Sequence, residues 1–522
     1  MLLLKNILKV GTVIGDGTRS FTVEKPVSEV IALRRHPNGG RGEPAQTNGV
    51  LRIIPTIIVE DILKGLRNNS IQLSDIIRKN RDEQQLPGIF STLGLDHDSF
   101  IMGYDSTILK ICEYVLAHEN DTTIEVNSSN TSINSLPKPF LLLAGISGTG
   151  KTRFVREQAA SHRPDLSNYC LIPVRPDWHE PSDLLGYVSR MGTPHYVVTE
   201  LLCFVVAAWN EAVASTSAEG IQNKAPADMT PYWLCLDEMN LAPVEQYFAD
   251  YLAVLETRTW NDGVYSCAPL LKADAFNKLP ESAATKMRED LKLAGPEYDG
   301  LWAYFLKTGI PLPPNLIVAG TVNMDETTHG FSRKVIDRAF TIDFGAFYPN
   351  DFEHYFEPQT KAKTLGFPCL SAVRKEDLEL VKGDPDGQKS IAFLNAINAV
   401  LKDTPFELAF RALNELLISL VCFKPEGDAA LQAVWDDFLM TKVLPRIDGD
   451  SHKLGETETG SLLTRLATVA AAQCPAIWTT TRIDLLRETA HEKGIDVPCR
   501  SKAKLAWMQE RLASNGFTSF WP

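Results

Sequence analysis

The stretch "LLLAGISGTGKTRFVREQAA", residues 141–160, decides the fold class of this 522-residue chain. A run of apolar residues, typical of a buried β-strand, leads into three closely spaced glycines, and a lysine and a threonine then begin a helical pattern. The central residues, 145–152, fit the spacing G-x-x-x-x-G-K-[ST]. Glycines in such a loop let backbone N–H groups turn towards phosphate oxygens. The stretch therefore predicts a strand, a phosphate-binding loop and a helix, in that order.

The side chains of this loop predict a nucleotide site that uses magnesium. In the pattern, the lysine reaches the β- and γ-phosphates and the hydroxyl of the next residue is a magnesium ligand. We expect ATP or GTP as the substrate and Mg²⁺ as the cofactor. The expected nucleotide-binding residues of the loop are Gly145, Ile146, Ser147, Gly148, Thr149, Gly150, Lys151, Thr152 and Arg153.

A second apolar run, "YWLCLDEMN" (232–240), ends in paired carboxylates. The carboxyl ends of parallel strands meet at one edge of a sheet, so Asp237 is expected beside the phosphate loop, where it and Thr152 would hold magnesium. Glu238 is then placed to polarise the attacking water. Acidic residues that merely cap a strand are the alternative. The Asp-Glu pair indicates hydrolysis rather than simple nucleotide binding.

A third apolar run, "NLIVAGTVN" (315–323), ends at Asn323, whose amide would orient the attacking water. Arg333 and Arg338 follow it and are candidates for an arginine that reaches the nucleotide of a neighbouring subunit. Arg411, in the later helical pattern "FELAFRALNELL", is a candidate for contact with the phosphates of its own chain. Surface or paired arginines are the alternative for all three. With Lys151 and Glu238, the residues Asn323, Arg333 and Arg338 complete the expected catalytic set.

The whole chain predicts several domains. Strands and helices alternate from residue 140 onward, which predicts a parallel sheet with crossover helices, an α/β three-layer sandwich. The expected domains are a small α+β N-terminal domain (1–120), a linker (121–139), an α/β NTPase core (140–345) with an insertion at about 260–312, a helical lid (346–460) and a C-terminal helical segment (461–522).

Composition and charge restrict the class of protein. The formal net charge of −13 disfavours a surface that binds nucleic acid everywhere, but it is compatible with a local basic groove. The nine cysteines are scattered, with no C-x-x-C pair, as in a reducing compartment. The sequence has neither a signal-peptide pattern nor an apolar run of about 20 residues. We therefore expect a cytoplasmic protein without membrane association.

Taken together, these motifs resemble the AAA+ ATPases. Longer strings resemble the McrB-type branch, the motor subunits of modification-dependent restriction systems; they are "VRPDWHEPSDLLGYVSR", "LCLDEMNLAPVEQYFADYLAVLETR", "PPNLIVAGTVNMDETTHGFSRKVIDRAF" and "KVLPRIDG". The resemblance covers residues from about 140 to 450. It implies an AAA+ P-loop sandwich with a helical lid, a ring that is usually hexameric, DNA contact, and a separate McrC-type nuclease as partner.

The sequence departs from this branch at one string. Members that hydrolyse GTP carry M-N-x-x-D-R, whereas this chain keeps Asn323 and has Asp325 and Glu326 in place of the Asp-Arg step. The N-K-x-D string of Ras-like GTPases is also missing, so the choice between ATP and GTP stays open. The alternative function is a MoxR-like ATPase chaperone that remodels a protein partner.

Three further segments carry weaker expectations. The insertion, with Trp302, Tyr304 and Phe305, would contact a partner or DNA, or else pack on its own core. The loop "RRHPNGGR", with Arg34, Arg35 and Arg41, would contact DNA phosphates, or else be solvated. The loop around His179 is expected at an interface. The alternative, a metal site of His179 with Asp177 and Glu180, is disfavoured because adjacent side chains cannot all turn to one ion.

Overall fold

The computed structural model describes residues 13–14, 21–23, 30–35, 51–55, 134–217, 220–261, 263–324, 329–455 and 460–521. The chain divides into two compact units, Met1–Asn130 and Thr131–Pro522, which are described separately. None of the helices in these described ranges is both long and apolar enough to cross a membrane.

The first unit contains a four-stranded antiparallel sheet. Its strands pair in chain order and are β1 (Val13–Ile14), β2 (Phe21–Val23), β3 (Val30–Arg35) and β4 (Leu51–Pro55). These four strands agree with the β content expected of an α+β N-terminal domain. Arg34 and Arg35 lie in β3 and not in a loop, whereas Arg41 and residues 56–120 of that domain lie outside the described residues.

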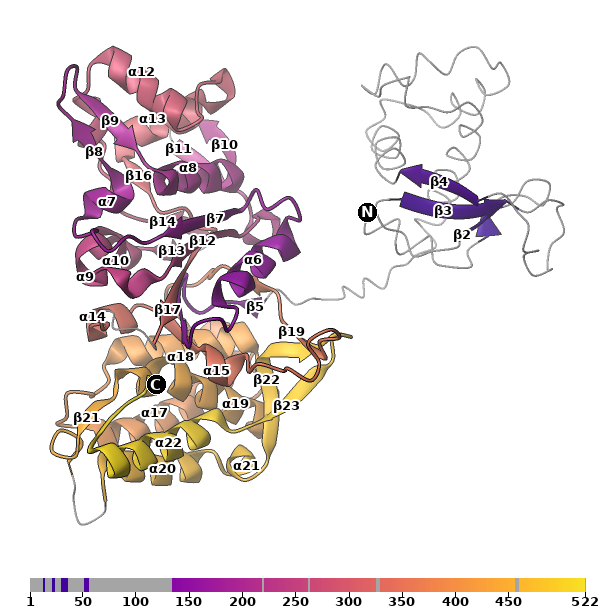
Figure 1. Ribbon diagram of the computed structural model, residues 1–522, viewed down its shortest axis with the longest axis vertical. Coiled ribbons are helices and arrows are strands. Elements are labelled where there is room, and N and C mark those ends of the chain that lie inside the picture. Colours follow the sequence, from indigo (N-terminus) through magenta and orange to yellow (C-terminus); the bar gives the residue numbers. More distant parts are fainter. Residues whose placement is uncertain are drawn as a thin grey trace. The chain divides into compact units, whose positions relative to one another are not determined.

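The second unit is built on a five-stranded sheet in which all neighbours run parallel. Its spatial order is β18-β6-β17-β12-β7. Figure 1 labels β17, β12 and β7 of this sheet. The strands are β6 (Phe140–Gly145), β7 (Tyr169–Pro173), β12 (Tyr232–Asp237), β17 (Leu316–Asn323) and β18 (Phe340–Asp343). Four of them agree with the sequence expectation, β7 with the apolar run "YCLIPV" (169–174), and β18 was not anticipated. The fold is therefore mixed α/β with a parallel sheet.

The two faces of the sheet are covered by different helices. Helix α6 (Lys151–His162) packs on the face that carries Leu141, Leu143 and Trp233. Helix α8 (Glu200–Ala212) packs on the opposite face. Side chains alternate between the faces of a strand, so both faces can be buried only because β6 and β12 are apolar at nearly every position. The carboxyl edge of the sheet stays free for the loops that follow the strands.

Short elements surround this core. They are β5 (Asn134–Ser135), α7 (Pro181–Leu185), β8 (Gly186–Ser189), β9 (His195–Val198), β10 (Val213–Ser217), β11 (Gly220–Asn223), α9 (Val244–Tyr247), α10 (Ala249–Leu255), α14 (Arg333–Ile336) and α15 (Phe344–Phe347). Trp178, in the loop before α7, packs edge-on against Tyr247 with ring centroids 5.3 Å apart, while His179 is exposed.

The insertion is a decoration of the sheet core. It contains β13 (Thr259–Asn261), β14 (Val264–Ser266), β15 (Pro269–Leu271), α11 (Asp274–Asn277), α12 (Glu281–Asp290), α13 (Asp299–Thr308) and β16 (Ile310–Pro311). Phe305 is fully buried and its ring centroid lies 6.4 Å from that of Trp209 on α8. Trp302 is also buried, and Tyr304 contacts Trp209 as well. Trp302 and Phe305 therefore pack on the protein's own core, and Tyr304 is half-buried beside them.

The C-terminal part is not purely helical, which corrects the sequence expectation. Its elements are β19 (Thr360–Ala362), β20 (Leu365–Gly366), α16 (Lys375–Leu378), α17 (Gln388–Leu401), α18 (Phe410–Phe423), α19 (Asp428–Phe438), β21 (Asp448–Asp450), α20 (Leu462–Gln473), α21 (Pro475–Trp478), β22 (Thr481–Thr489), β23 (Gly494–Pro498), α22 (Arg500–Asn515) and β24 (Phe517–Ser519). Strands β19, β22 and β23 form an antiparallel sheet.

The predicted boundary at residue 460 does not separate two bodies. Helices α17 and α20 pack together, and β22 packs on α19, so the lid and the C-terminal segment form one packed part (Figure 1). Its buried side chains belong to the same apolar cluster as the α6 face of the sheet.

Candidate functional site

The phosphate loop, residues 145–150, joins β6 to α6 at the carboxyl edge of the sheet. Gly148 and Gly150 have φ angles of 79° and 87°, in the left-handed region that side-chain-bearing residues rarely adopt. A Cβ atom at either position would meet nothing within 4 Å, so the backbone conformation, and not crowding, requires glycine. The loop is open to an incoming ligand.

The Lys151 ammonium lies inside this loop. It donates to the carbonyl oxygens of Gly145 and Ile146 at 3.0 and 2.7 Å, and the side chain is almost fully buried. A cation held at the centre of a loop whose N–H groups lie at a helix N-terminus is positioned for an anion. The loop therefore suits a phosphate group chemically.

Thr152 and Asp237, the two predicted magnesium ligands, are in direct contact. The Thr152 hydroxyl donates to Asp237 Oδ1 at 2.7 Å. One hydroxyl and one carboxylate are hard oxygen donors, and magnesium commonly uses one or two protein ligands together with water and substrate phosphates. In the described part of the chain no group of three or more His, Cys, Asp or Glu side chains could hold a metal by itself. The pair fits Mg²⁺ that arrives with a nucleotide.

Glu238 has an unusual backbone conformation. Its φ of 52° and ψ of 49° lie in the left-handed region, which costs free energy for any residue with a Cβ. The Glu238 N–H donates to Thr321 Oγ1 at 2.9 Å, and Glu238 Oε1 accepts from Asn323 Nδ2 at 3.4 Å. The carboxylate is therefore turned towards the end of β17. Strain of this kind is typical of functional sites.

Asn323 is placed next to the phosphate loop by strand pairing. It is the register partner of Gly145 across β17 and β6, so the amide stands between the loop and Glu238. Asn240 donates to its carbonyl oxygen at 3.1 Å and holds this strand end. The structure thus brings Lys151, Thr152, Asp237, Glu238 and Asn323 to one edge of the sheet.

Thr321 was missed by the sequence analysis. Its hydroxyl donates to Asp237 Oδ1 at 2.7 Å and accepts from the Glu238 backbone, and the residue is buried. The signal was present in the sequence, because Thr321 and Asn323 are two positions apart and lie on one face of the same strand.

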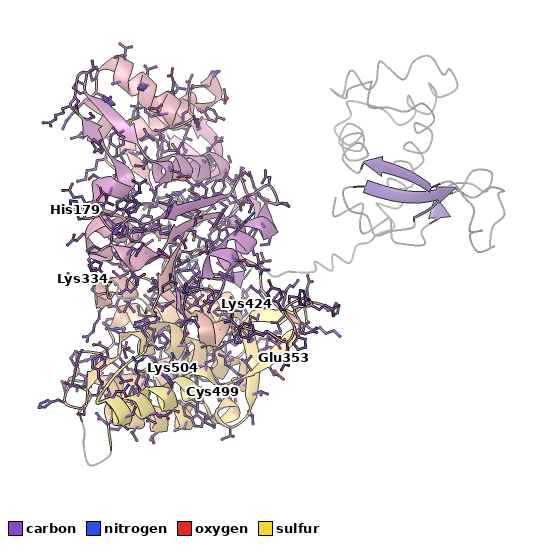
Figure 2. The ribbon with its side chains drawn as sticks, viewed as in Figure 1. His179, Lys334, Glu353, Lys424, Cys499 and Lys504 are labelled. Atoms are coloured by element: carbon purple, nitrogen blue, oxygen red, sulfur yellow. The ribbon has the colours of Figure 1, made fainter. Side chains whose placement is uncertain are left out.

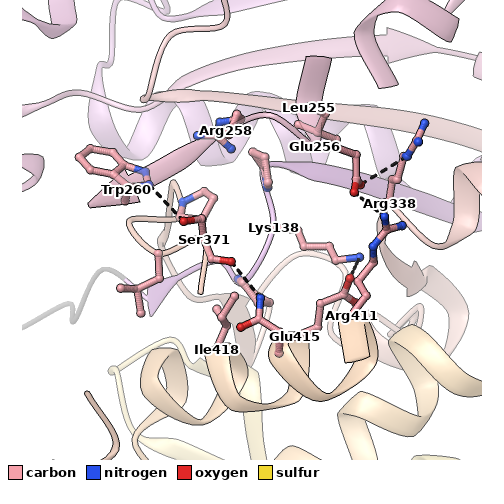
Figure 3. Close-up of a pocket in the computed structure, with 15 residues that line it drawn as sticks. Lys138, Leu255, Glu256, Arg258, Trp260, Arg338, Ser371, Arg411, Glu415 and Ile418 are labelled. Atoms are coloured by element: carbon pink, nitrogen blue, oxygen red, sulfur yellow. Dashed lines mark hydrogen bonds and ion pairs between the residues drawn. The ribbon is translucent and has the colours of Figure 1, made fainter. Parts of the chain in front are cut away.

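Arg338 and Arg411 share one carboxylate. Arg338 Nε lies 3.3 Å from Glu256 Oε1, and Arg411 Nη2 lies 2.5 Å from Glu256 Oε2. Figure 3 shows both guanidinium groups converging on Glu256. All three line a cavity of about 200 Å³, the amino-edge pocket, together with Pro139, which precedes β6.

This pocket lies at the opposite edge of the sheet from the phosphate loop. Strand β6, six residues long, separates Pro139 from the loop, a span of about 20 Å. Arg338 therefore lies away from the phosphate loop of its own chain. Arg411 lies with it, so the expected contact of Arg411 with the phosphates of its own chain is not formed.

Arg333 and Arg153 have other partners. Arg333 donates to the Pro405 carbonyl at 2.8 Å and its guanidinium lies 4.8 Å from the Phe406 ring centroid, so it fastens α14 to the C-terminal part. Arg153 is exposed and pairs with Glu157 at 2.7 Å. Asp325 and Glu326 lie outside the described residues.

A buried ionic cluster anchors the residue before Arg338. Lys138 and Lys442 both donate to the Asp337 carbonyl at 2.7 Å, and both pair with Glu415, at 2.6 and 2.8 Å. Burial lowers the pKa of Lys138 to about 7, while Glu415 opposes this shift. Because Lys442 and Glu415 belong to the C-terminal part, the position of Arg338 depends on how that part packs.

Comparison with known proteins adds one family match. Residues 371–517 match a family model described as "Domain of unknown function (DUF8727)". This range covers α16 to α22 of the C-terminal part and leaves the phosphate loop outside it. A search of curated proteins found no match to the chain.

Proposed function

We propose that this protein is a nucleoside-triphosphatase of the AAA+ type, which hydrolyses ATP or GTP at the carboxyl edge of its sheet. One observation carries the proposal: Lys151, the Thr152–Asp237 pair, Glu238 and Asn323 come from three different strand ends and meet around one open phosphate loop. Each is a residue type that phosphoryl transfer to water requires.

The roles follow from the positions. The loop N–H groups and Lys151 would bind the β- and γ-phosphates. Thr152 and Asp237 would hold Mg²⁺, which supplies charge neutralisation on the phosphates when bound. Glu238 would take the proton of the attacking water, and the Asn323 amide would orient that water. The Asn323–Glu238 contact of 3.4 Å keeps the two groups close enough to act on one water molecule.

The arginines support a ring assembly in this proposal. Arg338 and Arg411 lie at the edge opposite their own phosphate loop, so a nucleotide that they contact would be bound to another subunit. An arginine supplied by a neighbour stabilises transition-state charge and makes hydrolysis depend on assembly. We infer that the second arginine, Arg411, acts beside Arg338 and not on its own chain's nucleotide.

Steady-state hydrolysis of ATP and of GTP tests the activity. Wild-type protein should turn over at least one of them with Mg²⁺, and Glu238→Gln should bind the nucleotide without turnover. Glu379→Gln, at an exposed position far along the chain, is the matched control and should behave as wild type. Absence of turnover with both nucleotides under assembling conditions would refute the proposal.

Mixing two inactive variants tests the shared site. In a ring, an Arg338→Ala subunit still offers Glu238 and a Glu238→Gln subunit still offers Arg338. An equimolar mixture should therefore regain activity at about a quarter of its interfaces. No recovery, with rings verified by sedimentation, would contradict an arginine supplied by the neighbour.

The biological role rests on the resemblance of residues 140–450 to McrB-type motors. In this role the protein would assemble as a hexamer in the cytoplasm and drive an McrC-type nuclease against foreign or modified DNA. Stimulation of nucleotide turnover by DNA or by such a nuclease would support it. Stimulation by a protein substrate alone would favour the MoxR-like chaperone role instead.

A further inference from the structure

A short helix that follows the last strand of the sheet, α15, packs directly against the phosphate loop. A Cβ atom on Gly145, the first residue of the loop, would lie 3.3 Å from Phe344 Cβ and 3.7 Å from the Gly345 nitrogen. The Phe344 ring meets the ring of Phe154, in the first turn of α6, with centroids 5.8 Å apart. Tyr348, which follows α15, packs on Phe154 as well, with centroids 4.9 Å apart. Helix α15 therefore backs both the strand that enters the loop and the helix that leaves it.

This contact bears on the lysine of the loop. The Gly145 carbonyl oxygen accepts a hydrogen bond from Lys151 Nζ at 3.0 Å and another from the Met324 N–H at 3.3 Å. Phe344 occupies the space beside Gly145 that a side chain would otherwise fill. A movement of α15 would leave room for Gly145 to shift, and the Lys151 ammonium group would shift with it.

The position of α15 depends on its neighbours, because a helix of four residues is not stable alone. Asp343, the last residue of β18, caps it: Asp343 Oδ1 accepts from the Ala346 N–H at 3.4 Å. Asp343 Oδ2 lies 2.6 Å from Lys504 Nζ on α22, and the Lys504 and Asp343 side chains are only 10 and 11% exposed. Figure 2 shows Lys504 within the C-terminal part. A cation of the C-terminal part therefore fixes the start of α15.

Arg500 fixes the other end of α15. It lies one helical turn before Lys504, on the same face of α22. Its Nε donates to the Ala346 carbonyl oxygen at 3.2 Å, and its guanidinium lies 4.2 Å from the Phe347 ring centroid. Asp484 of β22 pairs with Arg500 at 2.6 Å and holds it in place. Two neighbouring cations of α22 thus hold α15 between the C-terminal part and the phosphate loop.

We propose that Lys504 is a positioning residue for the phosphate loop: it holds α15 against Gly145, so that affinity for the triphosphate depends on the C-terminal part. This inference rests on the proposed function. Coupling between two sites is reciprocal, so a bound triphosphate should in turn stabilise the packing of α22 on α15. The residues placed to act on water, Glu238 and Asn323, are held by contacts at the ends of β12 and β17, so Lys504 should affect binding more than turnover.

The C-terminal part keeps other contacts with the sheet core when Lys504 is replaced. The Gln158 amide on α6 donates to the Lys363 carbonyl oxygen at 2.9 Å and accepts from the Leu365 N–H at 2.8 Å. Lys442 donates to the carbonyl oxygen that precedes Arg338, at 2.7 Å. A substitution at Lys504 should therefore loosen α15 and leave the C-terminal part docked.

Calorimetry on the full chain tests the inference, with Mg²⁺ and ATP, GTP or inorganic tripolyphosphate as the probe. Lys504→Met should weaken tripolyphosphate and each nucleotide that wild type binds by a similar factor of about 5- to 150-fold. Turnover at saturating nucleotide should stay close to that of wild type. Lys504→Arg keeps the charge and should restore most of the affinity. Lys502→Met, on an exposed lysine of the same helix that donates to the Trp478 carbonyl oxygen, is the matched control and should bind as wild type does.

Hydrogen exchange of the wild-type protein gives a second measurement that needs no variant. Saturating Mg²⁺ and tripolyphosphate should slow amide exchange in α15 and α22, and Lys504→Met should lose the slowing in α22. Unchanged affinity in Lys504→Met with only a lower melting temperature, or α22 exchange in wild type that the ligand does not change, would overturn the inference and leave the proposed function standing. If wild type binds neither nucleotide nor tripolyphosphate, the proposed function is wrong and this inference falls with it.

Discussion

The Thr152 hydroxyl donates a 2.7 Å hydrogen bond to Asp237, a residue 85 positions later in the chain. The contact joins the phosphate loop to the end of β12, although β17 lies between β6 and β12 in the sheet. Asn323, at the end of that middle strand, consequently lies between the loop and Glu238. The order of the strands therefore builds the candidate site.

Thr321→Val should impair catalysis more than binding. The substitution keeps the volume and removes the hydroxyl that holds both Asp237 and the Glu238 N–H. Asp237 keeps its hydrogen bond from Thr152, but the Glu238 N–H loses the acceptor on Thr321, and leaving a buried donor unsatisfied costs about 1–3 kcal/mol. We expect turnover to fall by about tenfold or more and the Mg²⁺ concentration for half-maximal activity to rise. Thr321→Ser should retain activity. Equal turnover and equal Mg²⁺ dependence in Thr321→Val and wild type would refute this positioning role.

Glu256→Gln should lower turnover without weakening nucleotide binding. Glu256 holds the guanidinium groups of Arg338 and Arg411 side by side, about 20 Å from their own phosphate loop. With the charge removed, the arginines lose their common orientation. In the proposed mechanism these arginines stabilise the transition state and not the bound nucleotide, so turnover would fall while affinity stays unchanged. Turnover at saturating nucleotide and the dissociation constant should be measured together. Glu281→Gln, at an exposed position of α12, is the control; a change in affinity alone would contradict the assignment.

Lys138→Met should flatten the pH dependence of stability. Burial lowers the pKa of Lys138 from 10.5 to about 7 in the folded protein. Between these two pH values the unfolded chain binds more protons than the folded one, so the free energy of unfolding rises with pH.

Denaturant unfolding at pH 7.0 and 8.5 measures this effect. Wild type should gain about 1–2 kcal/mol relative to Lys138→Met over this range. Thiols of the unfolded chain titrate at about pH 8.5, but both proteins carry the same cysteines, so this contribution cancels in the comparison. Lys278→Met, which removes an exposed lysine paired with Asp274, should show the wild-type dependence. A parallel pH dependence for Lys138→Met and wild type would show that Lys138 titrates normally.

Arg482→Met should unfold the C-terminal part under mild conditions. Arg482 is fully buried and pairs with Asp436 at 2.7 Å and with Asp437. Burial acts to raise the pKa of Asp436, but Arg482 and the hydrogen bonds from Ser501 and Arg500 outweigh it and lower that pKa. Removing the cation takes the ion-pair partner from buried Asp436, whereas Asp437 keeps its pair with Arg500. Loss of one partner from a buried ion pair costs about 3–5 kcal/mol.

A surface ion pair gives the matched comparison for this loss. Lys382 pairs with Glu426 at 2.6 Å, yet both side chains are mostly exposed, so Lys382→Met should change stability little. Equal melting temperatures for Arg482→Met and wild type would show that the cluster is not needed for stability.

Local patterns in the sequence recovered much of the sheet and not all of it. Strands β6, β12 and β17 were predicted because each is a long apolar run that is buried on both faces. Strand β18 escaped notice because its four residues, with Thr341 and Asp343 among them, are too few to set a pattern. Strand β22 was read as helical because arginine, aspartate and glutamate interrupt its apolar residues, and its burial depends on α19.

The sequence by itself determined the phosphate loop, the Asp237–Glu238 pair and Asn323, because each stands at the end of an apolar run and local chemistry marks it. Only the tertiary structure decided which of these side chains touch, and it added Thr321, whose role comes from partners more than 80 positions away. It also showed that Arg411 pairs with Glu256 and does not lie at its own phosphate loop. The physical reason is that apolar patterns indicate which segments are buried and motif spacing indicates the phosphate loop. The pairing of charged side chains depends instead on how distant segments pack.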